Sequence, residues 1–184
     1  MENKFFLILI LLFVANTIQS QSCFDRKDQP EFKDVQDFET YGSTFIGCQM
    51  PKFNTSFTDG TPVSKDSLYG KVVVMYFWSL HKDFYTNEIP FLNKLVDSLK
   101  GQKVEFIAVC YDDPSKWDKR SEAFFHFKHI AQSKPLMDKF KAHPVIVIFD
   151  KNEKTVFYNC GMTENGKELK KRSDRYLKVI KDNL

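Results

Sequence analysis

The sequence carries little net charge, which limits the partners that it can attract electrostatically. Its 184 residues hold 27 lysine and arginine side chains against 24 aspartate and glutamate side chains, a balance of +3. This charge is too small to indicate nucleic-acid binding, which calls for a strongly basic surface. Residues 167–181 are rich in lysine, but apolar residues recur among them at helical spacing. We therefore interpret this stretch as a docked helix with a solvated basic face.

Long apolar runs are also scarce, and the only prominent one is at the N-terminus. Residues 5–14 are unbroken apolar, Lys4 precedes them, and residues 15–22 are small and polar. This layout is typical of a cleavable secretory signal, and the run is short for a membrane span. We predict a signal peptide over residues 1–20 and a secreted or periplasmic protein. An uncleaved N-terminal anchor and a lipid on Cys23 are the alternatives.

Internal repeats and low-complexity linkers are absent, which favours one domain. After the signal, about 160 residues remain, enough for a substantial core. Aromatic residues make up 15% of the chain, which argues against disorder. We predict an N-terminal extension over residues 21–45 and a single domain over residues 46–184.

The pattern of apolar residues predicts alternating strands and helices. Buried strands are expected at 72–78, 104–110 and 145–149, with a hairpin partner at 154–159 and an N-terminal hairpin around 52–61. Helices are expected at 31–41, 83–100 and 133–140, and at the C-terminus. A further helix is expected to start at 112–114, and the aromatic residues up to Phe127 would lie on one side of it. His126 and His129, in the same stretch, are expected to be structural residues. This order predicts a three-layer α/β/α sandwich.

Several short motifs, in this order, resemble those of the thioredoxin superfamily. They are IGCQMPKF at 46–53, DG at 59–60, L-x-GKVVV at 68–74, FWS at 77–79 with EIP at 88–90, HP at 143–144 and FDKNEK at 149–154. The chain resembles most closely the exported TlpA-like thiol–disulfide oxidoreductases, which border the peroxiredoxin-type AhpC/TSA group. The resemblance implies a thioredoxin-like fold and a cis-proline at Pro144.

The redox motif of that family, W-C-x-x-C-x-x-E-x-P, has lost its cysteines here. Matching Glu88 and Pro90 to the motif puts Lys82 and Tyr85 at the two cysteine positions, and no cysteine lies between residues 48 and 110. The chemistry needs a thiolate, favoured by a helix N-terminus, and a second thiol that resolves the mixed disulfide. We therefore expect no ordinary disulfide exchange at this site, no catalytic residue there and no cofactor.

The four cysteines of the chain allow three pairings, and the implied fold bears on them. Cys110 and Cys160 would end strands with two other strands between them, about 14 Å apart. Disulfide partners need Cα atoms within about 7 Å, so this pair is disfavoured. A structural bridge between Cys23 and Cys48 is easier, and Cys110 is expected to be a small, inert core residue.

The resemblance places a set of residues on what would be the vestigial active-site face. They are Trp78, His81, Lys82, Asp83, Phe84, Tyr85, Glu88, His143 and Pro144. We interpret this face as a binding site for an exported protein or peptide partner, since a cis-proline leaves neighbouring backbone free to pair with an extended peptide. Glu88 is expected to pair with Lys82.

Two other functions stay open from the sequence. One is thiol–disulfide exchange through a cysteine at a non-standard position, such as Cys48 or Cys110. The other is binding of copper or zinc by His81 and His143, because imidazole suits both metals.

Overall fold

The computed structural model describes residues 23–25, 38–80, 85–110, 112–117, 125–140, 144–160 and 165–184. The predicted signal peptide lies outside these ranges. Within them, no helix is both long enough and apolar enough to cross a membrane.

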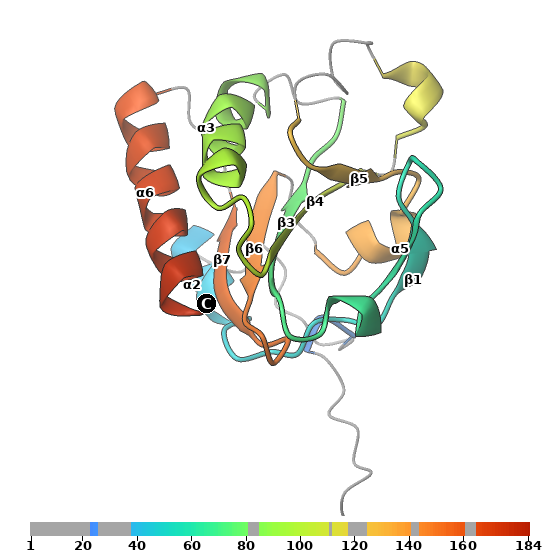
Figure 1. Ribbon diagram of the computed structural model, residues 1–184, viewed down its shortest axis with the longest axis horizontal. Helices are drawn as coiled ribbons and strands as arrows, with labels where there is room; N and C mark the ends of the chain where they lie inside the picture. Colours follow the sequence, from blue (N-terminus) through green and yellow to red (C-terminus); the bar gives the residue numbers. More distant parts are fainter. Residues whose placement is uncertain are drawn as a thin grey trace, which may run out of the picture.

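The centre of the molecule is a five-stranded mixed sheet in the order β5-β4-β3-β6-β7 (Figure 1). Its strands are β3 (Val72–Phe77), β4 (Val104–Val109), β5 (Lys128–Ile130), β6 (Val145–Phe149) and β7 (Thr155–Cys160). Strands β3, β4 and β5 run parallel, whereas β6 is antiparallel to both β3 and β7. The β-branched and aromatic residues that dominate the central strands pack well on a surface covered on both sides.

Strand β3 shows how the sequence builds two cores. All six of its residues are buried, and successive side chains point to opposite faces. Val73, Met75 and Phe77 enter one apolar cluster, whereas Val74 and Tyr76 enter the other. A continuous apolar run is therefore what a central strand between two layers requires.

Two helices cover one face of the sheet (Figure 1). Helix α3 (Tyr85–Ser98) connects β3 to β4, and α6 (Gly166–Asp182) ends the chain. Their apolar stripes enter the same cluster, with Ile89 and Leu92 from α3 and Ile180 from α6. The Asn165 side chain caps α6 by accepting hydrogen bonds from the backbone N–H groups of Lys167 and Glu168.

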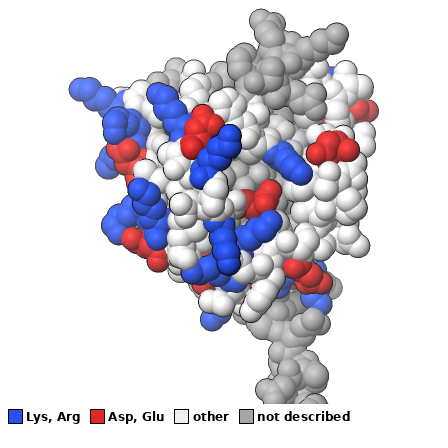
Figure 2. Space-filling view, in the orientation of Figure 1, with Lys and Arg blue, Asp and Glu red and all other residues white. Residues whose placement is uncertain are grey.

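The solvent side of α6 is charged, as the sequence predicts for a docked helix. Acidic and basic side chains alternate over it (Figure 2), and pairs four residues apart join Lys170 to Asp174 and Lys178 to Asp182. Exposed pairs of this kind contribute only a few tenths of a kcal/mol each, about 0.3–0.5.

The other face is covered by short elements that come mainly from the N-terminal half. They are the 3₁₀ turn η2 (Cys23–Asp25), α2 (Phe38–Ser43), the hairpin β1 (Asn54–Ser56) and β2 (Pro62–Ser64), and α5 (Lys134–Met137). Phe24 lies at their centre, stacked on Phe45 at 4.9 Å and against Phe140 at 4.6 Å between ring centroids. The core on this face of the sheet is therefore aromatic, and only short elements cover it.

A disulfide joins Cys23 to Cys48 across this layer, with Cα atoms 5.5 Å apart. The bond fastens turn η2 to the chain just before β1, and the Lys139–Asp25 ion pair ties the same turn to the chain just after α5. The bridge considered from the sequence is thus present, and Cys110 and Cys160 are buried thiols outside any disulfide.

The predicted helix after residue 112 is wrong. The structure has a three-residue 3₁₀ helix, η5 (Pro114–Lys116), capped by the Asp113 side chain, and a parallel edge strand, β5, where His129 lies. Phe125 and Phe127 are not helical either. The aromatic residues of this stretch are spaced by contacts with the sheet rather than by a helical period. Phe124, also expected on that helix, lies outside the described residues.

The predicted end of the first helix, before Gly42, is also wrong, because α2 runs on to Ser43. Gly42 is needed inside the helix for a packing reason. A Cβ atom there would lie 2.7 Å from the Tyr158 carbonyl oxygen, so only glycine lets α2 approach β7 this closely.

Candidate functional site

Trp78 follows β3 directly and forms the floor of the candidate site. It is 1% exposed, and its backbone N–H donates to the Val109 carbonyl oxygen at 3.0 Å. The indole packs against Trp117, Phe125 and His129, with ring centroids 5.3–5.9 Å away. Trp78 therefore has a packing role beside the candidate site, and its buried indole exposes little area that a partner could contact.

His129 is the most unusual member of this aromatic cluster. It is 4% exposed, and its Nε2 has no protein hydrogen-bond partner among the described residues. Burial lowers the pKa of His129 to about 4, so the imidazole is neutral at pH 7.

A second buried feature ties the end of β3 to the end of β4. The Asp112 carboxylate accepts a hydrogen bond from the Leu80 backbone N–H at 2.9 Å and from the Cys110 thiol at 3.2 Å. The Asp112 backbone N–H donates in return to the Cys110 sulfur at 3.4 Å. The carboxylate thus holds the segment that leads into residues 81–84.

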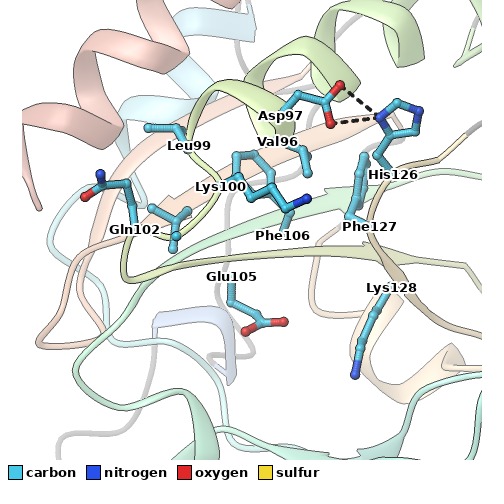
Figure 3. A pocket seen from close by; sticks show the side chains of 12 residues that line it. Val96, Asp97, Leu99, Lys100, Gln102, Glu105, Phe106, His126, Phe127 and Lys128 are labelled. Carbon is cyan, nitrogen blue, oxygen red and sulfur yellow. Dashed lines mark hydrogen bonds and ion pairs between the residues drawn. The ribbon is translucent and has the colours of Figure 1, made fainter.

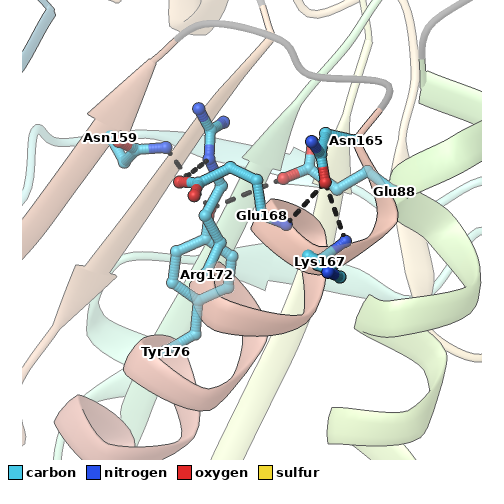
Figure 4. A network of polar contacts seen from close by, with 7 residues as sticks. All are labelled: Glu88, Asn159, Asn165, Lys167, Glu168, Arg172 and Tyr176. Carbon is cyan, nitrogen blue, oxygen red and sulfur yellow. Dashed lines mark hydrogen bonds and ion pairs between the residues drawn. The ribbon is translucent and has the colours of Figure 1, made fainter.

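Glu88, on the first turn of α3, is buried, and its carboxylate lies near the Tyr176 hydroxyl of α6 (Figure 4). Its carboxylate accepts hydrogen bonds from the Tyr76 hydroxyl at 3.1 Å and from the Tyr176 hydroxyl at 3.5 Å. Asn159 donates in turn to the Tyr176 hydroxyl at 3.3 Å. Burial raises the pKa of Glu88, while Tyr76, Arg172 and Tyr176 oppose that rise. The network links β3, β7, α3 and α6 beneath the candidate face.

The structure describes only part of the predicted face. Trp78, Glu88 and Pro144 are all buried, and Pro144 directly precedes β6. Tyr85 is the first residue of α3, but its side chain is not described. The remaining predicted residues lie outside the described ranges: His81, Lys82, Asp83, Phe84 and His143. Among the residues that are described, no three histidine, cysteine or acidic side chains are grouped as metal ligands.

Neither of the two thiols outside the disulfide is placed for ordinary exchange chemistry. Cys110 follows β4 and Cys160 ends β7, so β3 and β6 lie between them, as expected from the sequence. Burial raises the pKa of Cys160 to about 12 and raises that of Cys110 as well. Both thiols are therefore protonated at pH 7, and a protonated thiol is a poor nucleophile.

One well-formed pocket lies away from this face, near the start of β4 (Figure 3). It measures about 340 Å³ and lies between the end of α3, β4 and the segment before β5. His126 stands at its rim. Its backbone N–H donates to the Asn93 side-chain oxygen at 2.9 Å, and its Nδ1 lies 3.0 Å from an Asp97 carboxylate oxygen. At the surface, His126 thus links α3 to the segment that precedes β5.

The sequence matches the model of the AhpC/TSA family over residues 46–157. This chain belongs to the AhpC/TSA family. The matched region runs from the segment before the hairpin into β7, and so includes β3, β4, β5, β6 and the first half of β7. No curated protein matches the sequence significantly.

Solved structures similar to this chain include thiol–disulfide oxidoreductases. The thioredoxin domain of one from Bacteroides vulgatus aligns with TM-score 0.59 and 20% identity, covering 72% of this chain and 97% of that one. A thiol:disulfide interchange protein from Chlorobium tepidum gives 0.60 and 14%, covering 73% and 94%. A secreted Mycobacterium tuberculosis disulfide oxidoreductase, homologous to Escherichia coli DsbE, gives 0.55 and 17%, covering 71% and 95%. These likenesses confirm the thioredoxin-like fold.

Sequence reasoning missed the partners of the buried groups. Asp112 lies three residues after the end of the buried strand β4, and this position near a strand end was the available signal. The Tyr76 and Tyr176 contacts with Glu88 had no such signal, because they join residues 12 and 88 positions apart.

Proposed function

We propose that this protein is an exported thioredoxin-like domain that binds a protein or peptide partner through its vestigial active-site face and does not catalyse disulfide exchange. The observation that carries the proposal is the state of its cysteines. Lys82 and Tyr85 occupy the redox positions of the family motif. Cys23 and Cys48 are bonded to each other, and the two remaining thiols are buried.

The arrangement beneath the face supports a preserved scaffold. Trp78 and Pro144 are buried at the neighbouring ends of β3 and β6, and the Asp112 carboxylate holds the Leu80 N–H. A surface that keeps its supports after losing its thiols retains the means to bind. The DsbE-like and secreted structural neighbours support export, together with the predicted signal peptide.

Partner capture with a matched pair of variants tests the binding site. Protein from Gln21 onward is immobilised as wild type, as the double variant Phe84→Ala and Tyr85→Ala, and as Lys178→Ala on the exposed side of α6. We expect the double variant to lose the partners that the wild type retains and Lys178→Ala to keep them. If every captured partner stays bound to the double variant, this face is not the binding site.

Thiol–disulfide exchange through a non-standard cysteine is the second candidate. The Cys23–Cys48 disulfide favours it, because Cys23 is only half-buried and an incoming thiolate could attack its sulfur and release Cys48 as a thiolate. Reduction of insulin under dithiothreitol, with each cysteine replaced by serine in turn, separates the two functions. A rate above background that one substitution abolishes would establish redox chemistry and reject the non-catalytic function.

Binding of copper or zinc through His81 and His143 remains a third proposal from the sequence. Calorimetric titration of the wild type and of the double variant His81→Ala and His143→Ala tests it. Heat that the double variant lacks would support a metal site, and no heat with either metal would remove it.

A further inference from the structure

The hydrogen bonds of the N-terminal hairpin reveal which backbone groups of β1 point away from β2. The register pairs Asn54 with Ser64 and Ser56 with Pro62. In the same register, Lys65 N–H donates to the Phe53 carbonyl at 3.2 Å, and Phe57 N–H donates to the Thr61 carbonyl at 2.9 Å. Antiparallel ladders alternate bonded and non-bonded pairs, so the bonded positions of this strand are 53, 55 and 57.

The intermediate residues, Asn54 and Ser56, therefore direct their N–H and C=O groups to the outer edge of β1. Pro62 agrees with this assignment, since it has no N–H to give and lies opposite Ser56 in a non-bonded pair. Thr58, next on the same edge, already uses its outward N–H in a 2.9 Å bond to the His129 carbonyl of β5. No hydrogen bond to another described residue engages the outward backbone groups of Asn54 and Ser56.

The space beside this edge is a groove. The chain leaves β5 at Ile130, and Gln132 takes a left-handed conformation (φ 51°). Between β1 and α5, at the right of Figure 1, lies a pocket of about 300 Å³. Residues 52–55 form one wall, and Gln132, Ser133, Pro135, Leu136 and Lys139 form the other.

The chemistry of the groove indicates what it would accept. The half-buried Phe53 and the buried Leu136 give it apolar walls for side chains. Among its described lining residues, only Lys52 and Lys139 are ionisable, and none carries a carboxylate. Lys139 already pairs with Asp25, so the exposed Lys52 supplies the stronger attraction.

We propose that the outer edge of β1 is a docking site for an extended, acidic peptide segment of a partner protein, which adds a strand beside Asn54 and Ser56. Main-chain hydrogen bonds would hold the strand, apolar side chains would enter the groove, and acidic side chains would meet Lys52. The site is distinct from the vestigial active-site face and does not depend on the function proposed for it.

Fluorescence polarisation with a labelled heptapeptide of alternating valine and glutamate tests the docking mode. Successive N–H groups of a strand point to opposite edges, so one set of residues bonds β1 and the other faces away. Two N-methylated forms of the peptide are compared. One lacks the N–H groups of its valines, and the other lacks the N–H groups of its glutamates. We expect one form to bind at least tenfold more weakly and the other to keep its affinity. Equal affinities of the two forms, or equal binding of a valine–lysine peptide, would overturn the proposal.

Protein variants locate the site. Ser56→Pro removes an outward N–H and leaves the ladder bonds to β2 in place, so we expect a similar melting temperature and at least fivefold weaker binding. Lys52→Glu should weaken binding of the acidic peptide at least fivefold, whereas Lys178→Glu on α6 should not, and this pair decides the test if the proline variant does not fold. The Phe84 and Tyr85 double variant should bind the probe normally, which separates this site from the vestigial face. Unchanged binding by Lys52→Glu would refute the location.

Discussion

Replacing Cys23 and Cys48 together by alanine removes the cross-link that holds turn η2 against the aromatic core. The bond joins residues 25 positions apart, and closing a loop of this length in the unfolded chain costs about 3.5 kcal/mol of conformational entropy at 25 °C. The ring contacts of Phe24 with Phe45 and Phe140 do not need the sulfur atoms, so they remain available to the folded variant. We therefore expect the free energy of unfolding to fall by about 3–4 kcal/mol.

Urea denaturation at pH 7 measures this loss. With a slope of about 2 kcal/mol per molar urea, the midpoint should fall by about 1.5–2 M. Dithiothreitol should reproduce the fall in the wild type and leave the variant unchanged, because Cys110 and Cys160 form no disulfide. A loss below about 1 kcal/mol, or a variant that still responds to dithiothreitol, would refute the reasoning.

Three further predictions follow from buried groups and close contacts. Because burial lowers the folded pKa of His129 to about 4, below the unfolded value, its stabilising effect is complete above about pH 6.5 and is lost as the pH falls through 4. Between pH 7 and pH 4, the free energy of unfolding of His129→Phe should therefore fall by about 3 kcal/mol less than that of the wild type. Parallel plots of unfolding free energy against pH for the two proteins would contradict this. Cys110 and Cys160, which are buried and form no disulfide, should resist iodoacetamide at pH 8 in the folded protein and both react in urea, as mass spectrometry will show. Rapid labelling without urea would indicate an accessible thiol. Gly42→Ala should lower stability by more than about 1 kcal/mol, because its Cβ would meet a β7 carbonyl, whereas Gly166→Ala, with no atom within 4 Å, should not.

The sequence by itself determined the elements whose signals are local. The apolar runs of β3, β4 and β6 and the stripes of α3 and α6 follow from periods of two and 3.6 residues, which neighbouring residues express without help from the rest of the chain. The order of these elements and the family motifs were enough to predict the thioredoxin-like sheet. The same motifs placed Lys82 and Tyr85 at the redox positions.

Only the tertiary structure decided the features that depend on distant contacts. Strand β5 exists because three residues hydrogen-bond along β4, and their aromatic neighbours suggested a helix instead. Gly42 lies inside α2 because β7 comes close, and Glu88 accepts hydrogen bonds from tyrosines of β3 and α6. The outward edge of β1 likewise became visible only through its pairing register. In each case the decisive partner lies on another element, and the fold alone brings the two together.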